Sequence, residues 1–186
     1  MNDTTRSLMD AGAVARSIKR LSHEIHEHQP DPSQLVVVGI VRRGAVLASR
    51  LQGMLAELAG QEVGRGTLDI SLYRDDHRDV GMAPRLLARE TPALEGKHVV
   101  LVDDVLYTGR TVRAALQALT DAGRPARIEL AVLIDRGERQ LPIRADYVGK
   151  NVSVPREQRV YVRLAEIDGT DAVLLGAAVD PGRPAG

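Results

Sequence analysis

The stretch His98-Val-Val-Leu-Val-Asp-Asp-Val-Leu-Tyr-Thr-Gly-Arg-Thr111 decides the fold class of this chain. Residues 98–102 predict a strand that is apolar on both faces, which is typical of a parallel sheet covered by helices on each side. Residues 112–119 carry apolar side chains at helical spacing, and residues 128–134 predict a further buried strand. The order of strand, loop, helix and strand predicts an α/β fold with a mostly parallel central sheet flanked by helices.

The same alternation extends towards the N-terminus. Asp10 precedes an apolar stripe at helical spacing and is placed to cap that helix. The predicted elements, in chain order, are a helix over residues 14–25, a strand over 35–38, a loop at 39–44, a helix over 45–59 and a strand over 67–72.

Residues 73–95 are polar and contain glycine and proline, so they predict a long excursion of the kind that forms lids. We expect one domain over residues 1–180 and a disordered tail over residues 181–186. The chain has 186 residues and a formal net charge of zero, so nucleic-acid binding would need cations gathered on one face. It has no cysteine, which excludes thiolate metal sites and cysteine nucleophiles. Without a long apolar segment or a secretion signal, we expect a cytoplasmic protein with no membrane partner.

Two adjacent acids, Asp103 and Asp104, follow the apolar strand directly. In open α/β sheets, ligands bind beyond the carboxyl ends of the strands. Neighbouring carboxylates repel each other and are costly to desolvate, so they need partners there. Sugar hydroxyls and hydrated Mg²⁺ are suitable partners, because an ionised carboxylate only accepts hydrogen bonds and Mg²⁺ prefers oxygen ligands.

The next residues, Thr108-Gly109-Arg110-Thr111, predict a phosphate site. Gly109 permits a sharp turn, the two threonines add hydroxyl donors, and the start of a helix favours an anion. The two acids can accept hydrogen bonds from the hydroxyls of a sugar, and the phosphate site follows them directly. Together they predict that this loop binds a ribose 5-phosphate. The simpler alternative is an exposed turn followed by an ordinary helix cap.

This loop resembles the 5-phosphoribosyl pyrophosphate motif of the type I phosphoribosyltransferases. Residues 68–76, 131–137 and 141–151 resemble one subfamily, the PyrR-type pyrimidine operon attenuator with uracil phosphoribosyltransferase activity. The likeness runs from about Val14 to Asp171. It implies a type I phosphoribosyltransferase fold with a flexible hood, formed here by residues 73–95, and an assembly of two or more copies.

The resemblance implies that uracil and phosphoribosyl pyrophosphate give UMP and pyrophosphate, with Mg²⁺ as cofactor. The metal would arrive with phosphoribosyl pyrophosphate near Asp103 and Asp104. No metal is expected to bind without that ligand. The resemblance assigns catalysis to Asp103, Asp104 and Arg43, and ribose-phosphate binding to both acids and to the phosphate loop. That loop consists of Val105, Leu106, Tyr107, Thr108, Gly109, Arg110 and Thr111.

Further site residues follow from the same resemblance. Arg42, Arg43, Gly44 and Arg74 match positions that bind pyrophosphate, and Arg136 and Val160 match positions for the nucleobase and nucleotide. Arg42 stands where the family usually has threonine, and its charge would either tighten pyrophosphate binding or crowd the loop. For Arg74 the alternative is a surface cluster of ion pairs.

The family also binds a hairpin in the leader mRNA of its own operon, which UMP or UTP promotes. The matching RNA-binding residues are Lys19, His23, Arg139, Arg144 and Lys150. Glu138 stands where histidine is common and places an anion on this surface. The alternative for the residues at 139, 144 and 150 is a solvated basic loop.

Two other functions stay open at this stage. One is an RNA-binding regulator of the same fold without significant turnover, and the other is a phosphoribosyltransferase for another nucleobase. His23, His26 and Glu27 lie on one helix side, but their spacing departs from that of a zinc-binding helix. We therefore interpret them as a hydrated helix end.

Overall fold

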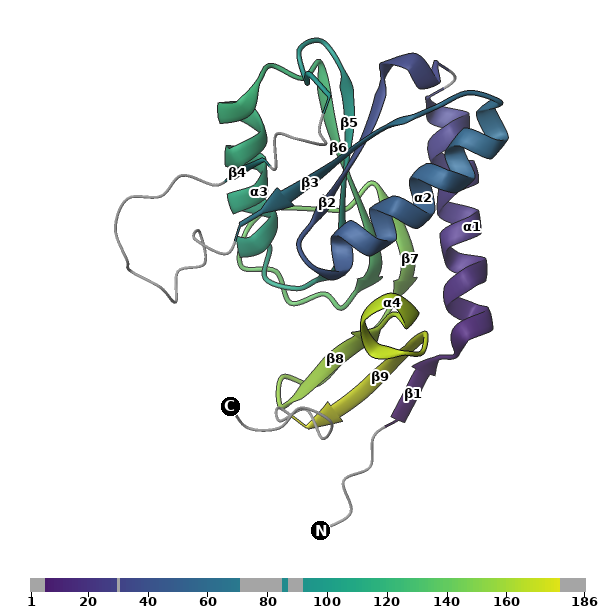
Figure 1. Ribbon diagram of the computed structural model, residues 1–186. Coiled ribbons are helices and arrows are strands. Elements are labelled where there is room, and N and C mark those ends of the chain that lie inside the picture. Colours follow the sequence, from purple (N-terminus) through teal and green to yellow (C-terminus); the bar gives the residue numbers. More distant parts are fainter. Residues whose placement is uncertain (1–5, 30, 71–84, 87–91, 178–186) are drawn as a thin grey trace.

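The computed structural model describes residues 6–29, 31–70, 85–86 and 92–177. The large sheet in this part of the chain has the order β4-β3-β2-β5-β6-β7 (Figure 1). All its strands are parallel except β4, which pairs antiparallel with β3. The strands are β2 (Leu35–Ile40), β3 (Gly64–Asp69), β4 (Arg85–Leu86), β5 (His98–Leu106), β6 (Arg127–Asp135) and β7 (Tyr147–Asn151). The predicted α/β fold with a mostly parallel sheet is confirmed.

Helices cover both faces of the large sheet (Figure 1). The first two lie on one face and the third lies on the other: α1 (Ala11–His28), α2 (Arg43–Ala59) and α3 (Arg110–Ala122). Within β5, Val100 and Val102 belong to the core beneath α1 and α2, whereas Val99 and Leu101 belong to the core beneath α3. Burial of both faces explains why this strand is apolar at every position.

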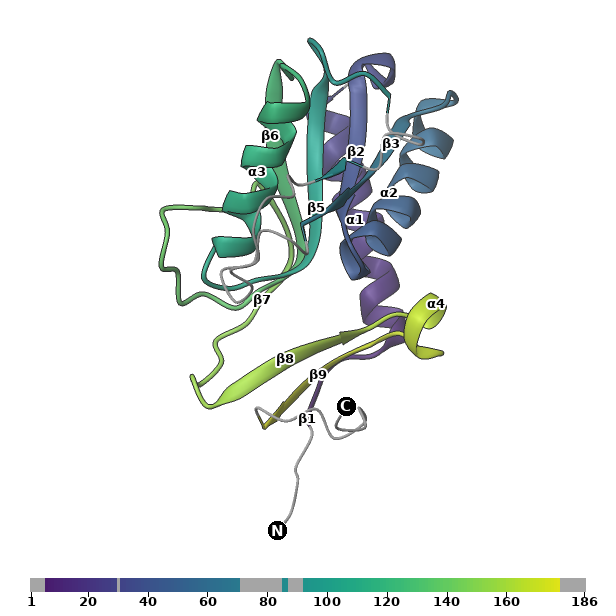
Figure 2. The ribbon, with the colours of Figure 1, turned by 60° about the vertical axis from the view of Figure 1, so that its left-hand side comes forward.

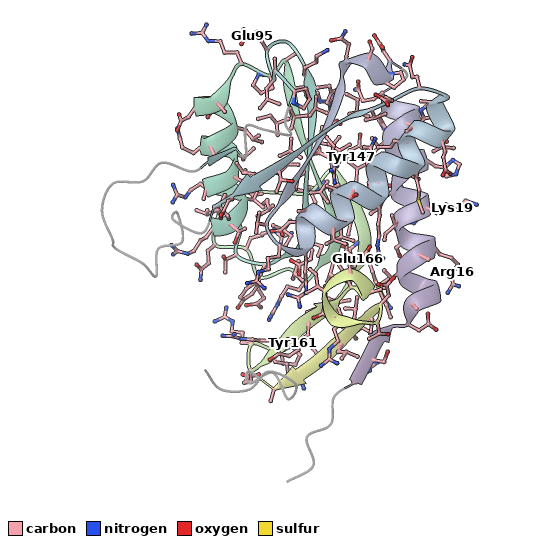
Figure 3. The ribbon with its side chains drawn as sticks, viewed as in Figure 1. Arg16, Lys19, Glu95, Tyr147, Tyr161 and Glu166 are labelled. Atoms are coloured by element: carbon pink, nitrogen blue, oxygen red, sulfur yellow. The ribbon has the colours of Figure 1, made fainter. Side chains whose placement is uncertain are left out.

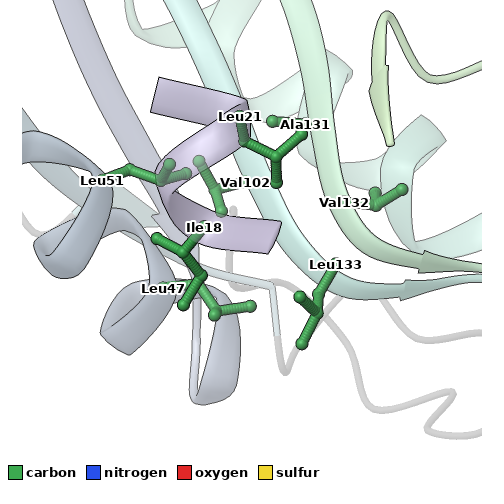
Figure 4. A pocket seen from close by; sticks show the side chains of 8 residues that line it. All are labelled: Ile18, Leu21, Leu47, Leu51, Val102, Ala131, Val132 and Leu133. Atoms are coloured by element: carbon green, nitrogen blue, oxygen red, sulfur yellow. The ribbon is translucent and has the colours of Figure 1, made fainter. Parts of the chain in front are cut away.

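A small cavity of about 10 Å³ lies in the core beneath α1 and α2 (Figure 4). Its lining is wholly apolar and consists of Ile18, Leu21, Leu47, Leu51, Val102, Ala131, Val132 and Leu133. Because a buried water or polar ligand needs polar partners, this cavity is a gap in packing and no ligand site.

The helix ends follow from local sequence. The Asp10 carboxylate accepts a hydrogen bond from the backbone N–H of Ala13 at 2.7 Å, so the predicted cap of α1 is confirmed. Gly60 ends α2 in the left-handed region, with φ of 66°. A single turn of 3₁₀ helix, η1 (Pro32–Gln34), leads into β2.

A second, three-stranded sheet lies opposite the carboxyl ends of the large sheet (Figure 2). This small sheet is antiparallel, in the order β1-β9-β8, and joins the two ends of the described chain. Its elements are β1 (Arg6–Met9), β8 (Gln158–Arg163), β9 (Ala172–Ala177) and the short helix α4 (Ala165–Asp168) between the last two strands. The sequence analysis did not predict this sheet, because its strands are short and β1 is paired with residues more than 160 positions away.

Several predicted boundaries differ from the structure. Strand β5 continues to Leu106, so both acids lie within the strand and not after it. Helix α2 begins at Arg43, so Arg43 and Gly44 belong to its first turn and not to a loop. Strand β3 ends at Asp69, three residues before its expected end at Leu72.

The expected hood falls mostly outside the described residues. Of residues 73–95, the structure describes only 85–86 and 92–95, and Arg74 and the tail at 181–186 also lie outside. The hood and the tail therefore stay predictions. None of the helices described is long and apolar enough to cross a membrane.

Candidate ribose-phosphate site

The two acids lie where β5 approaches the carboxyl edge of the large sheet. Asp103 is buried and Asp104 is half-buried. One carboxylate oxygen of Asp103 accepts from the backbone N–H of Asp104 at 2.9 Å, and one of Asp104 accepts from Val105 N–H at 2.9 Å. Side chains three residues apart in a regular strand point to opposite faces of the sheet. Val102 and Val105 nevertheless contact the same core cluster, so the regular alternation of side chains between the two faces is interrupted at Asp103 and Asp104.

Burial raises the pKa of the Asp104 carboxyl above its usual value, and the nearby Arg43 guanidinium acts in the opposite direction. Ionised Asp104 is therefore costly in this environment and depends on cations and donors around it. A ligand that brings hydroxyl donors or a metal cation would lower that cost.

The phosphate loop leads from β5 into α3 through a left-handed residue. Gly109 precedes the helix with φ of 90°, a conformation that glycine adopts readily. A Cβ at this position would lie 3.3 Å from the Ile143 side chain, so the turn is also closely packed. Thr108 and Thr111 are half-buried, and Arg110 is exposed. The N–H groups of the first helical turn thus face the same edge of the sheet as the acids, as an anion site requires.

Residues 137–143, which we call the supporting segment, pack against the phosphate loop. The backbone N–H groups of Gln140 and Leu141 both donate to Thr108 O, at 3.0 and 3.2 Å. The Arg110 guanidinium reaches the Gln140 side chain at 3.0 Å. The guanidinium of Arg139 turns inward to backbone carbonyls of the loop, although this residue was expected on an RNA-binding surface.

The pyrophosphate residues lie at the start of α2, beside β5. Arg42 is exposed at the N-cap, after a cis peptide bond between Val41 and Arg42. Gly44 packs so closely on β5 that a Cβ would lie 2.4 Å from Val102 O and 3.2 Å from the Cα of Asp103. Only glycine fits this contact, which brings the start of α2 against the acids.

Arg43 connects the acids to the small sheet. Its Nη2 donates to both carboxylate oxygens of Asp168, at 2.8 and 3.1 Å, and Asp168 also accepts from Leu164 N–H. Its Nε is buried and has no hydrogen-bond partner among the described residues. The sequence analysis named Arg43 but not its partner Asp168, which carries no local signal because it is 125 residues away.

Arg136 forms a second connection to the small sheet. Its side chain is buried, and Nη1 donates to Gln158 O of β8 at 3.1 Å. The guanidinium lies 3.9 Å from the centre of the Tyr107 ring, and its Nε and Nη2 have no partner within the described part of the chain. Val160, two residues after Gln158 on β8, is half-buried and packs against the core beneath α1 and α2.

The other cations expected to bind RNA lie on α1, after the supporting segment and on β7. Lys19 and His23 are exposed on α1, where Lys19 points away from the protein (Figure 3). Arg144 is exposed, and Lys150 donates to Leu8 O of β1 at 2.8 Å. Glu138 has φ of 58° and pairs with Arg156 at 2.7 Å, so its negative charge is partly offset.

Magnesium would need ligands beyond the protein at this site. Within the described ranges, no group of three or more His, Asp or Glu side chains is arranged to hold a metal ion. Asp103 and Asp104 supply the hard oxygen ligands that Mg²⁺ prefers, and such sites are commonly completed by substrate oxygens and water. The donor set thus fits a metal that arrives with an oxygen-rich ligand.

Comparisons of sequence give a consistent result. The family model described as "Phosphoribosyl transferase domain" matches residues 4–161. A protein of Roseiflexus sp. named "Bifunctional protein PyrR" is 55% identical over 172 residues, which are 91% of this chain and 94% of the relative. The protein of Thermus thermophilus with the same name is 53% identical over 169 residues, 90% of this chain and 93% of the relative.

Comparisons of structure identify the same fold. The hypoxanthine phosphoribosyltransferase of Trypanosoma cruzi, in complex with the product IMP, superimposes with a TM-score of 0.71 at 20% identity, over 95% of this chain and 91% of that one. The corresponding enzyme of Staphylococcus aureus gives a TM-score of 0.67 at 23% identity, over 97% and 98% of the two chains. At these identities the likeness bears on the fold alone, and it confirms the fold expected from the sequence.

Proposed function

The chain belongs to the phosphoribosyltransferase family, as a PyrR-type bifunctional protein, and we propose that it makes UMP and regulates a pyrimidine operon through RNA. In the reaction, N1 of uracil forms a bond to C1 of the ribose while the bond from C1 to pyrophosphate breaks. Uracil loses its N1 proton in the process. The single observation that carries this proposal is that one short loop leads from Asp103 and Asp104, near the carboxyl end of β5, to the left-handed Gly109 at the N-terminus of α3.

Asp103 and Asp104 are suited to accept hydrogen bonds from the two ribose hydroxyls. They lie near the carboxyl end of β5, shortly before the phosphate loop, whose N–H groups would hold the 5-phosphate. A ribose held at both ends has its C1 carbon fixed relative to the protein. Fixing the reacting carbon in this way removes much of the entropic barrier to the reaction.

Arg43 is suited to stabilise the leaving pyrophosphate. Its buried Nε has no partner in the described part of the chain, so a phosphate oxygen would satisfy an otherwise unpaired donor. The exposed Arg42 adds a second positive charge beside it. When bound, Mg²⁺ would neutralise charge that develops on the leaving group. Asp103 and Asp104 are the residues that would hold it, together with oxygens of phosphoribosyl pyrophosphate.

Arg136 is suited to bind the nucleotide from the other side of the site. Two buried nitrogens of its guanidinium lack partners among the described residues, and the stacked Tyr107 ring fixes its plane. In the family that the chain resembles, the positions of Arg136 and Val160 bind the nucleobase and nucleotide. Acceptor oxygens of the pyrimidine ring or of the UMP phosphate would satisfy the two donors.

The catalytic part of the proposal is tested by UMP formation. Purified protein is incubated with phosphoribosyl pyrophosphate, Mg²⁺ and each of uracil, hypoxanthine, guanine and orotate. We expect product with uracil, and we expect Asp104→Asn to lose most of this activity because the amide no longer carries a charge. Product with another base alone would replace uracil as substrate, and an unaffected Asp104→Asn variant would contradict the assignment of the site.

The regulatory part is supported by the exposed cations on α1 and by Arg144. Phosphate contacts dominate the affinity of proteins for nucleic acids and make it depend on salt. We expect leader RNA to bind more tightly with UMP present, with an affinity that falls steeply as salt increases. An RNA affinity that does not change with salt, or no RNA binding at low salt, would refute the regulatory part. Only the enzymatic part of the proposal would then remain.

A further inference from the structure

Arg139 lies in the supporting segment and makes contacts that an RNA-binding residue does not need. Its Nη1 donates to Tyr107 O at 2.9 Å, to Gly137 O at 3.0 Å and to Leu106 O at a longer 3.4 Å. Its Nε donates to Ile143 O at 3.0 Å. Each guanidinium nitrogen is thus engaged, because Nη2 pairs with the Asp135 carboxylate at 2.5 Å.

These contacts leave little of Arg139 for a partner. The side chain is only 22% exposed, and every nitrogen already donates to protein oxygen. A phosphate of RNA could bind this guanidinium only in exchange for one of the internal hydrogen bonds. Arg144, five positions later, is exposed and has the accessibility that an RNA contact requires.

The carbonyls that Arg139 holds determine where the amides of the phosphate loop point. In a trans peptide, the C=O of one residue and the N–H of the next point in opposite directions. Arg139 holds Tyr107 O, and it shares Leu106 O with the backbone N–H of Arg136, which donates at 3.1 Å. Fixing these two carbonyls directs the N–H groups of Tyr107 and Thr108 to the other side. Thr108 O, held by the amides of the supporting segment, orients Gly109 N–H in the same way.

Three successive N–H groups that face one side form a site for an anion. Such a concave arrangement of amides, with a left-handed residue in it, binds phosphate in many proteins. Gly109, with φ of 90°, supplies the left-handed residue here. The site depends on the carbonyls behind it being held, because unheld peptides would rotate and lose their common direction.

We propose that Arg139 is a positioning residue that holds the peptides of the phosphate loop so that their N–H groups bind the 5-phosphate of the ligand. This inference rests on the proposed function and deepens it. It also predicts that Arg139 influences RNA binding only through the loop, and not by contact with RNA.

The test compares Arg139→Gln, Arg139→Lys and a control, Arg16→Gln, at an exposed arginine of α1. We expect Arg139→Gln to raise the KM for phosphoribosyl pyrophosphate on the order of 10- to 100-fold, as removal of a partner that orients a metal-binding side chain does at metal sites. The KM for uracil should change little. Lysine keeps the charge but cannot span carbonyls on several sides, so Arg139→Lys should stay defective. Arg16→Gln should keep the parent KM.

A direct binding measurement uses ribose 5-phosphate with calorimetry. If the parent protein does not bind it, the proposed function fails; if the parent and both Arg139 variants bind it equally, only the role of Arg139 fails. An Arg139→Lys variant with the parent KM would show that charge alone matters and would overturn the proposal.

If Arg139→Gln does not fold, Asp135→Asn removes one support of Arg139 and should raise the same KM by a smaller factor. A parent KM in both Arg139→Lys and Asp135→Asn would then overturn the proposal.

RNA binding without nucleotide gives an independent readout. If Arg139 contacts a phosphate of RNA, Arg139→Gln should reduce the slope of log affinity against log salt by about 1. We expect the parent slope instead, and we expect the reduced slope for Arg144→Gln. A reduced slope for Arg139→Gln together with a parent KM for phosphoribosyl pyrophosphate would overturn the proposal.

Discussion

Replacement of Gly44 by alanine tests the contact that joins α2 to the acids. The added Cβ would lie 2.4 Å from Val102 O, whereas an ordinary contact begins near 3.4 Å, so the two must separate by 3.4 − 2.4 = 1.0 Å. Overpacking of this kind costs about 1–3 kcal/mol. The better helix propensity of alanine offsets about 0.5–1 kcal/mol of that cost. We therefore expect Gly44→Ala to be destabilised by about 1–2 kcal/mol, or roughly 2–8 °C in Tm.

Gly53 provides a matched control in the same helix. A Cβ at Gly53 would meet no atom within 4 Å, so only the gain in helix propensity applies. We expect Gly53→Ala to be stabilised by about 0.5–1 kcal/mol, with a Tm that rises by roughly 1–4 °C. Thermal unfolding followed by circular dichroism measures both changes. The opposite signs of the two shifts separate the contact of Gly44 from a general effect on α2.

The same pair of variants tests the site. Displacing the first turn of α2 by about 1 Å moves Arg43 away from its place beside Asp104, and a displacement of that size can lower kcat/KM on the order of 100-fold. Gly53→Ala should keep the parent kcat/KM. If Gly44→Ala keeps both the parent Tm and the parent kcat/KM for phosphoribosyl pyrophosphate, then α2 does not rest on β5 as described, and the reasoning fails.

Three further predictions concern the connections around the site. Asp168→Asn should raise the KM for phosphoribosyl pyrophosphate because it loosens Arg43. Glu166→Gln breaks an ion pair between the same short helix and Arg50, and it should leave this KM unchanged. Equal KM values for the two variants would contradict the role of Asp168. Arg50 lowers the pKa values of Glu166 and Asp171 below 4.5 and 3.8, so the stabilisation that it provides is complete above pH 4.5 and is lost as pH falls through the lowered values. Tm measurements should accordingly show Arg50→Gln below the parent at pH 7 and a difference that shrinks in acid; a constant difference would count against these ion pairs. Removal of Mg²⁺ with EDTA should abolish UMP formation and leave the Tm of the ligand-free protein unchanged, and a large fall in Tm would indicate a resident structural metal.

The large sheet could be predicted from sequence because its strands are buried on both faces. Residues 98–102 contain only apolar side chains after the first position, and such a run has few alternatives to a central parallel strand. The small sheet could not be predicted in the same way. Its strand β1 has four residues, three of them at least partly exposed, and its partner is β9 at the other end of the chain.

The phosphate loop was accessible from local sequence, whereas its supports were not. Gly109 and the two threonines form a compact motif whose chemistry can be inferred without a fold. Arg139 and Asp168 act through contacts 32 and 125 positions away along the chain. Sequence shows their charge but not the direction in which each side chain points, so Arg139 was interpreted as a surface residue.

The pairing of β1 with β9 has a consequence for synthesis of the protein. Residues 10–171 must be translated before β9 begins, which takes on the order of 8–30 s at the ~5–20 residues per second of translation. Throughout that interval β1 is an unpaired edge, and Gln158 and Asp168, which hold Arg136 and Arg43, are made only near its end. A ribosome-bound chain can therefore build most of its large sheet early, but it acquires a complete ligand site only as its last strand emerges.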